Sequence, residues 1–225
     1  GKSFYKTVIY DNRYEYLFEG LFHTIIIALF AVIIGIVIGI LVSLIRNNYE
    51  INGKNKLLYK IANLYVNIIR GTPVILQLMI IYYVIFKSVN INIVIVGIIA
   101  FGINSGAYVS EIIRAGINSI PKGQTEAGFS LGLRYRTVMR EIILPQAIRN
   151  ILPALGNEFI TLLKETSVGA YIGIVELTKA SDIIASRTYD YFFPLIIIAI
   201  IYLIMTLGLS KLVNVMERRL NRVRS

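Results

Sequence analysis

The feature of this sequence that most limits its fold is an uncharged apolar run from Gly20 to Ile45. A helix needs about 20 apolar residues to cross the hydrocarbon core of a membrane, and this run exceeds that length. The 225 residues are 56% hydrophobic with a mean hydropathy of +0.69, which is too apolar for the surface of a soluble domain of this size. The chain is therefore predicted to be an all-α integral membrane protein.

Four further segments complete a predicted layout of about five transmembrane helices. The stretch between Arg70 and Lys87 is too short to span alone, so the second span is expected to include residues before Arg70. It then carries the motif RGTP (Arg70–Pro73), whose proline should break or kink the helix. The remaining predicted spans are Ile91–Ser110, Phe192–Ser210 and a weaker one, interrupted by polar residues, at Ile148–Leu163.

The distribution of lysine and arginine predicts the orientation. If the C-terminus is cytoplasmic, fifteen basic residues face the cytoplasm and seven face outside, and basic residues favour the cytoplasmic side. We therefore expect an extracytoplasmic N-terminal segment (1–19), a transmembrane domain (20–219) and a cytoplasmic tail (220–225). The net charge of +10 then reflects topology and contact with anionic membrane lipid, and not nucleic-acid binding.

One basic, amphipathic stretch between the predicted third and fourth spans does not resemble a membrane helix. Residues 117–145 are expected to form a cytoplasmic segment in which two helices are joined by a turn. Pro121 suits a first helical position, Gly132 a left-handed stop, and Pro145 the return to the membrane. From these residues alone, docking into a groove of another protein and binding of anionic lipid headgroups by arginines are equally good readings.

Several motifs in the chain resemble those of a known family. Glu126-Ala127-Gly128, then Gly132, then Ile142 to Pro145 follow at the spacing of the EAA signature of bacterial ABC-importer permeases. Gly128 departs from that signature, which has a second alanine at this place. Three further stretches resemble permeases of the polar amino-acid uptake family, and the similarity extends over residues 20–219: Arg70–Pro73, Ala107–Gly128 and Leu152–Val168.

This resemblance implies a type I importer fold, a role for residues 117–145 and a set of partners. In the family, the EAA segment lies in a cleft of a cytoplasmic ATPase, which binds the ATP and Mg that this chain does not; no cofactor is expected in the chain itself. The other implied partners are a second permease copy or paralogue and an extracytoplasmic amino-acid-binding protein, in a bacterial cell membrane. The residues implied in coupling are Glu126, Ala127, Gly128, Gly132, Arg134, Leu144 and Pro145. Alternatively, Glu126 forms only a local ion pair with Lys122.

Polar residues inside the predicted spans are the candidates for a transport pathway. Such residues are costly in lipid, so they are expected either to have a function or to bond with a partner on another helix. Glu158, Thr161 and Glu165 share one helix face, with Asn157 beside them. Glu158 has no local basic partner and is the first substrate candidate, although an interhelical pair that only fixes packing is equally compatible. The further candidates are Asn104 for substrate binding and Arg70, Gly71, Pro73 and Glu165 for the pathway or its gating.

Other features are expected to be structural. Ala31, Gly35 and Gly39 form a stripe of small residues typical of close helix packing. Glu111 is expected to pair locally with Arg114, three residues further on. The chain has no cysteine and one histidine, so no metal site is expected.

Two other functional classes are alternatives to a subunit of an importer. A self-sufficient secondary transporter or channel for small polar solutes would predict an inverted repeat, and none is found. A membrane-embedded enzyme is disfavoured because the residues offer no nucleophile with a base and an orienting group, and no metal set. The sequence also shows no ATP-binding motif, so ATP hydrolysis is expected in a partner subunit.

Overall fold

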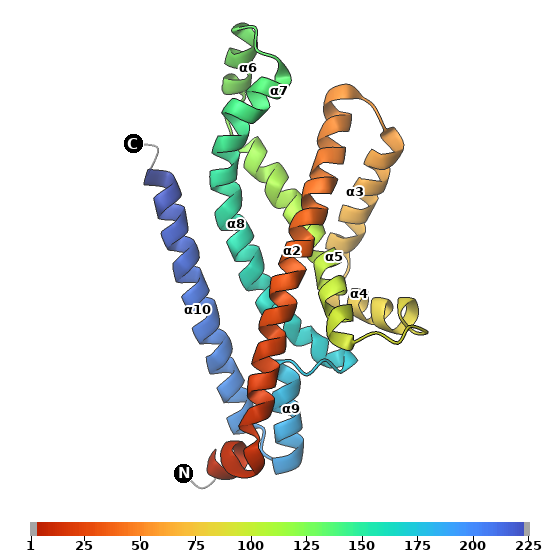
Figure 1. The fold of residues 1–225 in the computed structure, drawn as a ribbon, viewed down its shortest axis with the longest axis vertical. Coiled ribbons are helices and arrows are strands. Elements are labelled where there is room, and N and C mark those ends of the chain that lie inside the picture. The colour runs from red at the N-terminus through yellow and green to blue at the C-terminus, as the bar shows by residue number, and fades with distance from the viewer. Residues whose placement is uncertain (1–3, 223–225) are drawn as a thin grey trace.

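The computed structural model describes residues 4–222, and all the regular structure in that range is helical. Four long helices run along the long axis of the molecule (Figure 1). They are α2 (Tyr14–Asn52), α5 (Ile93–Asn118), α8 (Leu144–Glu165) and α10 (Phe192–Arg222). Residues 1–3 of the predicted N-terminal segment and 223–225 of the predicted tail lie outside the described range.

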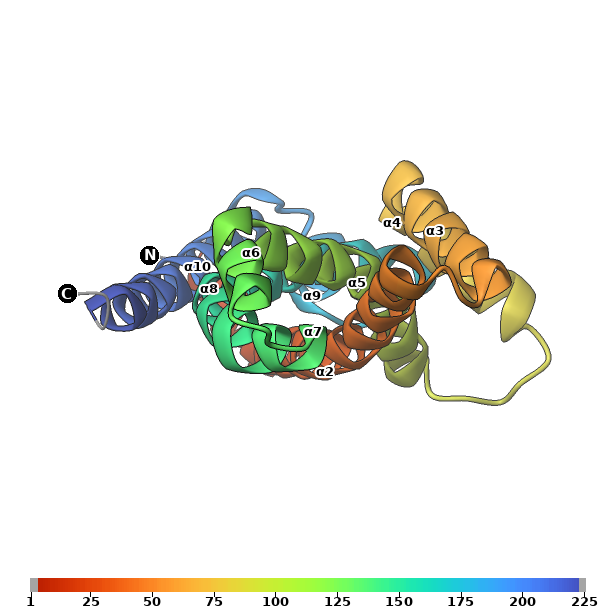
Figure 2. The ribbon, with the colours of Figure 1, turned by 90° about the horizontal axis from the view of Figure 1, so that it is seen from above.

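The two ends of the helix bundle carry different short elements (Figure 1). One end, here called the α6 end, holds α6 (Lys122–Ser130), α7 (Tyr135–Thr137) and the turn between α2 and α3 (Lys56–Gly71). The opposite end, the α9 end, holds η1 (Tyr5–Ile9), η2 (Tyr10–Asn12) and α9 (Leu177–Thr188). Seen along the long axis, α3 lies at one edge of the molecule and α10 at the other (Figure 2).

Not all of the predicted spans correspond to helices that are long and apolar enough to cross a membrane. Among the described residues, α2, α5 and α10 are long and apolar enough to cross a membrane, and the pair formed by α3 and the following helix makes a fourth when taken as one broken span. The segment predicted as a weak fourth span is helical, as α8, but it falls short of this criterion because its sequence carries several charged and amide side chains. The number of five crossings therefore remains a prediction.

The second predicted span is broken at the RGTP motif, as its proline led us to expect. Helix α3 ends at Gly71, and α4 (Val74–Ile80), which η3 (Ile81–Ile85) continues, leaves at an angle of 112°. Pro73 lies between them in an extended conformation, with φ −63° and ψ 137°. Proline cannot donate a backbone hydrogen bond, and it disfavours helical backbone in the residue before it, so the helix ends there.

The stripe of small residues on α2 packs against α5, which confirms its predicted structural role. Ala31, Gly35 and Gly39 are all buried. A Cβ on Gly35 would lie 2.6 Å from Ser105 Oγ, and a Cβ on Gly39 would lie 2.5 Å from Val109 Cγ1. Both distances are shorter than real contacts allow, so the two helices can approach this closely only because α2 has glycine at these positions.

We expect Gly39→Leu to destabilise the protein by about 3 kcal/mol, because the added side chain would have to push α5 away from α2. The matched control is Gly208→Leu on α10, where an added Cβ meets nothing within 4 Å. Thermal unfolding in detergent should show a lower midpoint for Gly39→Leu and little change for the control. Equal midpoints for both variants would contradict the packing described here.

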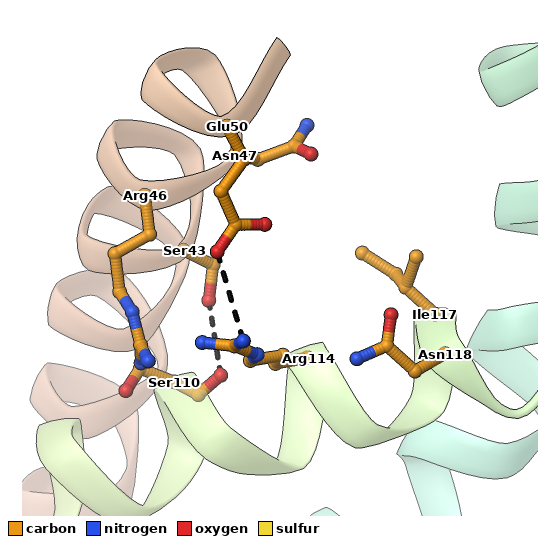
Figure 3. Close-up of a pocket in the computed structure, with 8 residues that line it drawn as sticks. All are labelled: Ser43, Arg46, Asn47, Glu50, Ser110, Arg114, Ile117 and Asn118. Atoms are coloured by element: carbon orange, nitrogen blue, oxygen red, sulfur yellow. Dashed lines mark hydrogen bonds and ion pairs between the residues drawn. The ribbon is translucent and has the colours of Figure 1, made fainter. Parts of the chain in front are cut away.

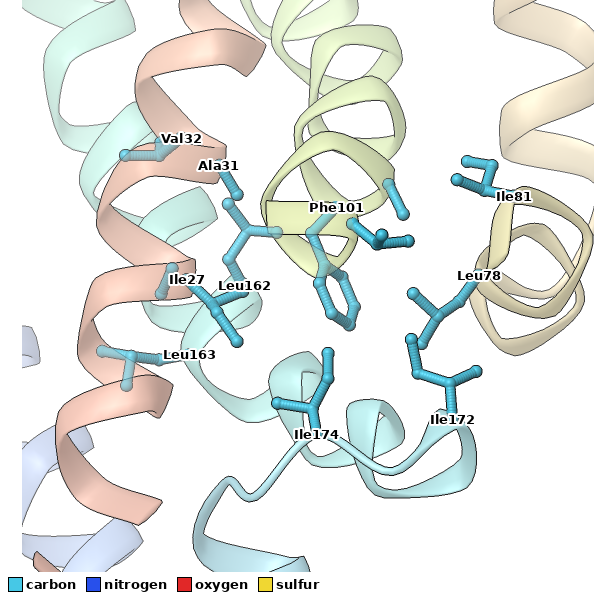
Figure 4. Packing of buried hydrophobic residues seen from close by; sticks show 13 residues of the cluster. Ile27, Ala31, Val32, Leu78, Ile81, Phe101, Leu162, Leu163, Ile172 and Ile174 are labelled. Carbon is cyan, nitrogen blue, oxygen red and sulfur yellow. The ribbon is translucent and has the colours of Figure 1, made fainter. Parts of the chain in front are cut away.

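The largest apolar cluster lies toward the α9 end and joins α2, α4, α5 and α8 (Figure 4). Phe101 of α5 is fully buried at its centre, with Leu78 of α4 on one side and Leu162 of α8 on the other. Ile174, in the segment that follows η5 (Thr166–Ile172), closes the cluster from below in this view. This cluster fixes the break between α3 and α4 against α5.

The segment between α5 and α8 forms two helices joined by a turn, as predicted. Gly132 has a φ of +77°, which confirms the left-handed stop. One detail of the prediction differs by one residue: Pro121 directly precedes α6 and is not its first helical residue. Pro145 occupies the first turn of α8, and α7, the wider-turned η4 (Val138–Ile143) and α8 follow one another directly. Proline has no backbone N–H to donate to the regular helical hydrogen bonds. The wider turn of η4, directly before Pro145, changes that hydrogen-bond pattern locally and so accommodates the proline.

The buried carboxylate of Glu176, which the sequence analysis did not predict to be important, holds α9 in place. The Glu176 side chain accepts hydrogen bonds from the backbone N–H groups of Thr178 and Lys179, both at 2.7 Å, and from the Tyr202 hydroxyl of α10 at 3.3 Å. Its backbone packs against Gly20 of α2. Burial raises the pKa of Glu176 to about 7.

This raised pKa predicts a pH dependence of stability. The folded chain binds the proton of Glu176 more tightly than the unfolded chain, so the stabilisation is complete below the ordinary pKa of 4.5 and is lost as the pH rises through about 7. We expect the melting temperature of the wild type to fall between about pH 4.5 and 7, and Glu176→Gln to remove that part of the fall. An unchanged slope in the variant would contradict this assignment.

Candidate substrate pathway and coupling segment

The polar residues predicted on α8 do share one face, and that face is accessible. Asn157 and Thr161 are exposed, while Glu158 and Glu165 are half-buried. Glu158 accepts a hydrogen bond of 2.8 Å from the hydroxyl of Ser105, which is itself fully buried on α5. The partner of Glu158 therefore comes from another helix, as its lack of a local cation suggested, but nothing in the sequence pattern identifies Ser105 as that partner.

A second polar network ties the break at RGTP to α5. Asn104 is buried and donates to Gln77 Oε1 at 2.9 Å. The amide of Gln77 in turn donates to the Ile69 carbonyl and to the Thr72 hydroxyl, both at 2.8 Å. Asn104, a predicted substrate ligand, is thus engaged with Gln77 in this conformation. Gln77 was missed by sequence analysis, although an amide four residues after Pro73 in an apolar stretch could have drawn attention to it.

The predicted local pair between Glu111 and Arg114 is wrong. Glu111 instead bridges two arginines from other helices: it pairs with Arg46 of α2, and its second oxygen lies 3.4 Å from Arg70 Nη1. The Arg70 guanidinium also lies over the Tyr108 ring, 5.9 Å from its centre. These ion pairs join α5 to α2 and to the end of α3. The prediction failed because residue spacing along one helix identifies only partners on that same helix.

Arg114 also pairs with α2, one helical turn closer to the α6 end than Glu111. It lies 3.6 Å from Glu50, and beside this pair Ser43 donates a hydrogen bond of 3.2 Å to the Ser110 carbonyl (Figure 3). These groups line a small cavity of about 50 Å³ between α2 and α5. The cavity is too small for an amino acid, so it belongs to the packing of the two helices.

We expect Glu111→Gln to lower the free energy of unfolding by about 2 kcal/mol, because Arg46 and Arg70 would be left facing each other without the carboxylate. The matched control is Glu50→Gln, which removes a more exposed pair and should cost about 0.5 kcal/mol or less. Melting temperatures of the two variants in the same detergent measure the difference. Equal losses would show that Glu111 does not hold α3 against α5.

The predicted coupling residues of α6 and the turn lie at the tip of the α6 end (Figure 1). Glu126 and Ala127 are exposed, and no ion pair joins Glu126 to Lys122 in the described chain, so the alternative local pairing is not formed. Gly128 is buried, and a Cβ there would lie 2.7 Å from Val138 Cγ2. Glycine in place of the second alanine of the signature is thus explained by the close approach of Val138.

The segment predicted to couple to an ATPase (residues 117–145, here called the coupling segment) also carries apolar side chains that face outward. Leu131 is 79% exposed and Phe129 is 47% exposed, and both come just before the turn at Gly132. Arg134 is exposed directly before α7, and Pro145 is exposed and Leu144 half-buried where α8 begins. Exposed apolar residues around a rigid turn are typical of a surface that docks with another protein.

Comparison with known proteins decides the family. Residues 32–222 match the family model described as "Binding-protein-dependent transport system inner membrane component". This chain belongs to that family. The resemblance to ABC-importer permeases is thereby confirmed, and the permease is a multi-pass protein of the bacterial cell membrane and a transport component, not a catalytic one.

Individual relatives agree with this assignment. The permease is 43% identical over 162 residues to the arginine transport system permease protein ArtQ of Bacillus subtilis (strain 168), which covers 71% of this chain and 74% of that one. It is also 43% identical over 169 residues to the putative glutamine transport system permease protein GlnP of Rickettsia prowazekii (strain Madrid E) (74% of this chain and 78% of that one). The crystal structure of an amino acid ABC transporter with histidines has a chain 45% identical to it, with a TM-score of 0.85 over 91% of this chain and 94% of that one.

No group of three or more histidine, cysteine, aspartate or glutamate side chains in residues 4–222 is placed to hold a metal ion. The candidate site consists of two parts, the accessible polar face of α8 and the exposed turn at the α6 end. Helix α8 connects them, because it runs from the coupling segment to Glu165.

Proposed function

We propose that this permease forms the membrane pathway of an ATP-driven importer of polar amino acids and works by alternating access. The support is the family, together with relatives that are named as permeases of glutamine and arginine transport systems. In this proposal the α6 end faces the cytoplasm and the α9 end faces outside, in agreement with the distribution of basic residues. An extracytoplasmic binding protein would then deliver the amino acid at the α9 end.

The observation that carries the substrate assignment is the polar face of α8. Asn157 and Thr161 are exposed at a depth where lipid contact would be unfavourable for them, so this face must meet water, substrate or a second permease. Glu158 offers a carboxylate that accepts a hydrogen bond from Ser105 and forms no ion pair within residues 4–222, and a carboxylate is the group that attracts an ammonium or a cationic side chain. We assign Asn157, Glu158 and Thr161 to substrate binding, with a preference for cationic amino acids. Asn104 would join them only in a conformation that releases Gln77.

Gating is assigned to the break between α3 and α4. Arg70, Gly71 and Pro73 form the junction, and Glu111 and Gln77 hold it to α5 in the present conformation. Because an added Cβ on Gly71 meets nothing within 4 Å, the junction has room to change its angle. Glu165, at the opposite end of the polar face, would border the pathway near its outer opening.

Coupling is assigned to the turn at the α6 end. The exposed Glu126 and Ala127, with Arg134, Leu144 and Pro145 behind the turn, would contact an ATPase subunit that binds ATP and Mg. Since α8 begins in this segment and carries Glu158, a shift of the segment would move the substrate face directly. The importer would contain two ATPases and a second permease, either another copy or a paralogue.

The experiment that tests this proposal is ATP hydrolysis by the partner ATPase, co-purified with the permease in lipid. The binding protein is added with arginine, lysine, histidine, glutamine or cystine, one at a time. Stimulation by one loaded binding protein supports the proposal and identifies the amino acid. Transport that proceeds without any ATPase would favour the alternative of a self-sufficient secondary transporter or channel.

A further inference from the structure

A groove that the transport pathway does not use runs along the bundle toward the α6 end. It has a volume of about 470 Å³ and lies between α2 and α8, with α5 forming part of its lining. Its walls are apolar side chains apart from Ser43 and Asn47 of α2. Ile40, Ile148 and Leu152 in its walls are exposed, at 45%, 46% and 37%.

The groove opens into a second, polar cavity of about 750 Å³ at the α6 end, and the two share Leu44 and Asn47. This cavity is lined by asparagines of α2 and by Arg134, Tyr135 and Arg136, and no acidic residue lines it. Both arginines are exposed, and no ion pair within residues 4–222 involves either of them. The mouth of the groove is therefore cationic and unneutralised.

We propose that this groove binds one anionic phospholipid, with an acyl chain between α2 and α8 and the phosphate headgroup at Arg136. The apolar groove suits an acyl chain, and the cationic mouth at its end suits a negatively charged phosphate headgroup. Basic pockets between transmembrane helices at the cytoplasmic side are typical sites for anionic headgroups. The inference requires only that the chain spans a membrane, and it does not depend on which amino acid is transported.

The length of the groove agrees with this occupant. Its lining on α2 extends from Ile36 to Asn47 and on α8 from Leu144 to Leu155. Eleven residues of helix rise about 16 Å, which is about half of the roughly 30 Å hydrocarbon core. The groove is thus as deep as one leaflet, and its mouth lies where the headgroups of that leaflet are expected.

The site also connects lipid to the coupling segment. Arg136 and Tyr135 belong to α7, directly after the turn at Gly132, and Tyr135 lies 3.4 Å from the side-chain amide of Asn47 on α2. A headgroup held here would contact α2 and α7 together. It would therefore stabilise the position of the coupling segment relative to the first transmembrane helix.

The test uses the full permease, assembled with its partner subunits, in phosphatidylcholine vesicles that contain a small fraction of phosphatidylglycerol with a photoreactive acyl chain. After irradiation, mass spectrometry maps the labelled residues. We expect labels between Ile36 and Leu44 and between Ile148 and Leu155. Unlabelled phosphatidylglycerol should compete for them, and additional phosphatidylcholine should compete far less.

Three variants separate this site from general lipid contact. Leu152→Trp should fill the groove and remove the labelling, and Arg136→Gln should leave the groove intact but reduce the preference for phosphatidylglycerol about fivefold. Ile196→Trp on α10, an exposed apolar position of similar accessibility, should change neither. If Leu152→Trp fails to fold, the lipid preference of Arg136→Gln still tests the proposal.

The proposal is overturned if phosphatidylcholine competes equally well or if Arg136→Gln retains the full preference. It is also overturned if labelling on α10 matches that in the groove, or if cross-links from a photoreactive side chain at Ile40 or Ile148 go to a second permease or an ATPase and not to lipid. Those last results would show that a protein covers the groove.

Discussion

Replacing Gly132 by valine will reduce substrate-stimulated ATP hydrolysis by the assembled transporter by about tenfold or more. Gly132 has a φ of +77°, and side chains other than glycine pay roughly 1–2 kcal/mol in this region, with β-branched residues among the least tolerant. An added Cβ meets no neighbour within 4 Å, so the effect arises from backbone strain alone. The turn would change shape, and the exposed residues Glu126 and Leu131 would no longer be presented together.

The matched control at the same position is Gly132→Asn. Asparagine tolerates positive φ better than other side chains, so this variant should keep most of the stimulation although it also adds a side chain. Hydrolysis is measured with and without loaded binding protein, and the yield of assembled complex is measured by size-exclusion chromatography. If valine and asparagine behave alike in folded complexes, the left-handed turn does not transmit the movement.

Replacing Glu158 by glutamine will raise the concentration of arginine or lysine needed for half-maximal uptake by about thirtyfold, which corresponds to ~2 kcal/mol. The change removes the negative charge but keeps the size of the side chain and its ability to accept from Ser105. Uptake of a neutral amino acid such as glutamine should change much less. The measurement is initial uptake into vesicles over a range of amino-acid concentrations.

Ser105→Ala separates substrate binding by Glu158 from a purely structural role. It removes the 2.8 Å hydrogen bond but leaves the carboxylate, so it should alter the half-maximal concentration by about threefold. If the two variants have equal effects, Glu158 acts as a packing partner of α5. Unchanged arginine and lysine uptake by Glu158→Gln would end the assignment of cationic selectivity.

Local features of the fold were predictable because their causes are local. The run from Gly20 to Ile45 is uncharged and longer than a bilayer requires, so it had to become a spanning helix. Pro73 cannot continue a helix, and the break appears where it stands. The left-handed conformation of Gly132 follows from its place between two helical patterns.

Contacts between helices were not predictable from one sequence. Spacing along a helix favoured Arg114 as the partner of Glu111, whereas the observed partners come from α2 and α3. Ser105 and Gln77, which hold Glu158 and Asn104, have no local signal that names their partners. The angle of 112° at the break is likewise set by the packing of Leu78 against Phe101, not by Pro73 alone.

The role of Gly128 is explained by the sequence pattern and the structure together. From the sequence, glycine in place of alanine was a small departure that left close packing possible. The structure supplies the reason, since Val138 lies where a Cβ would be. The signature and its exception thus describe one requirement, a small residue where α6 meets the following helix.

The most direct test of the central claim is uptake of radiolabelled amino acid into vesicles that contain the permease and its ATPase, with binding protein outside and ATP trapped inside. The account predicts uptake that requires both ATP and the binding protein and that is lost in Gly132→Val. Uptake that proceeds equally without ATP, or in the absence of the binding protein, would contradict it.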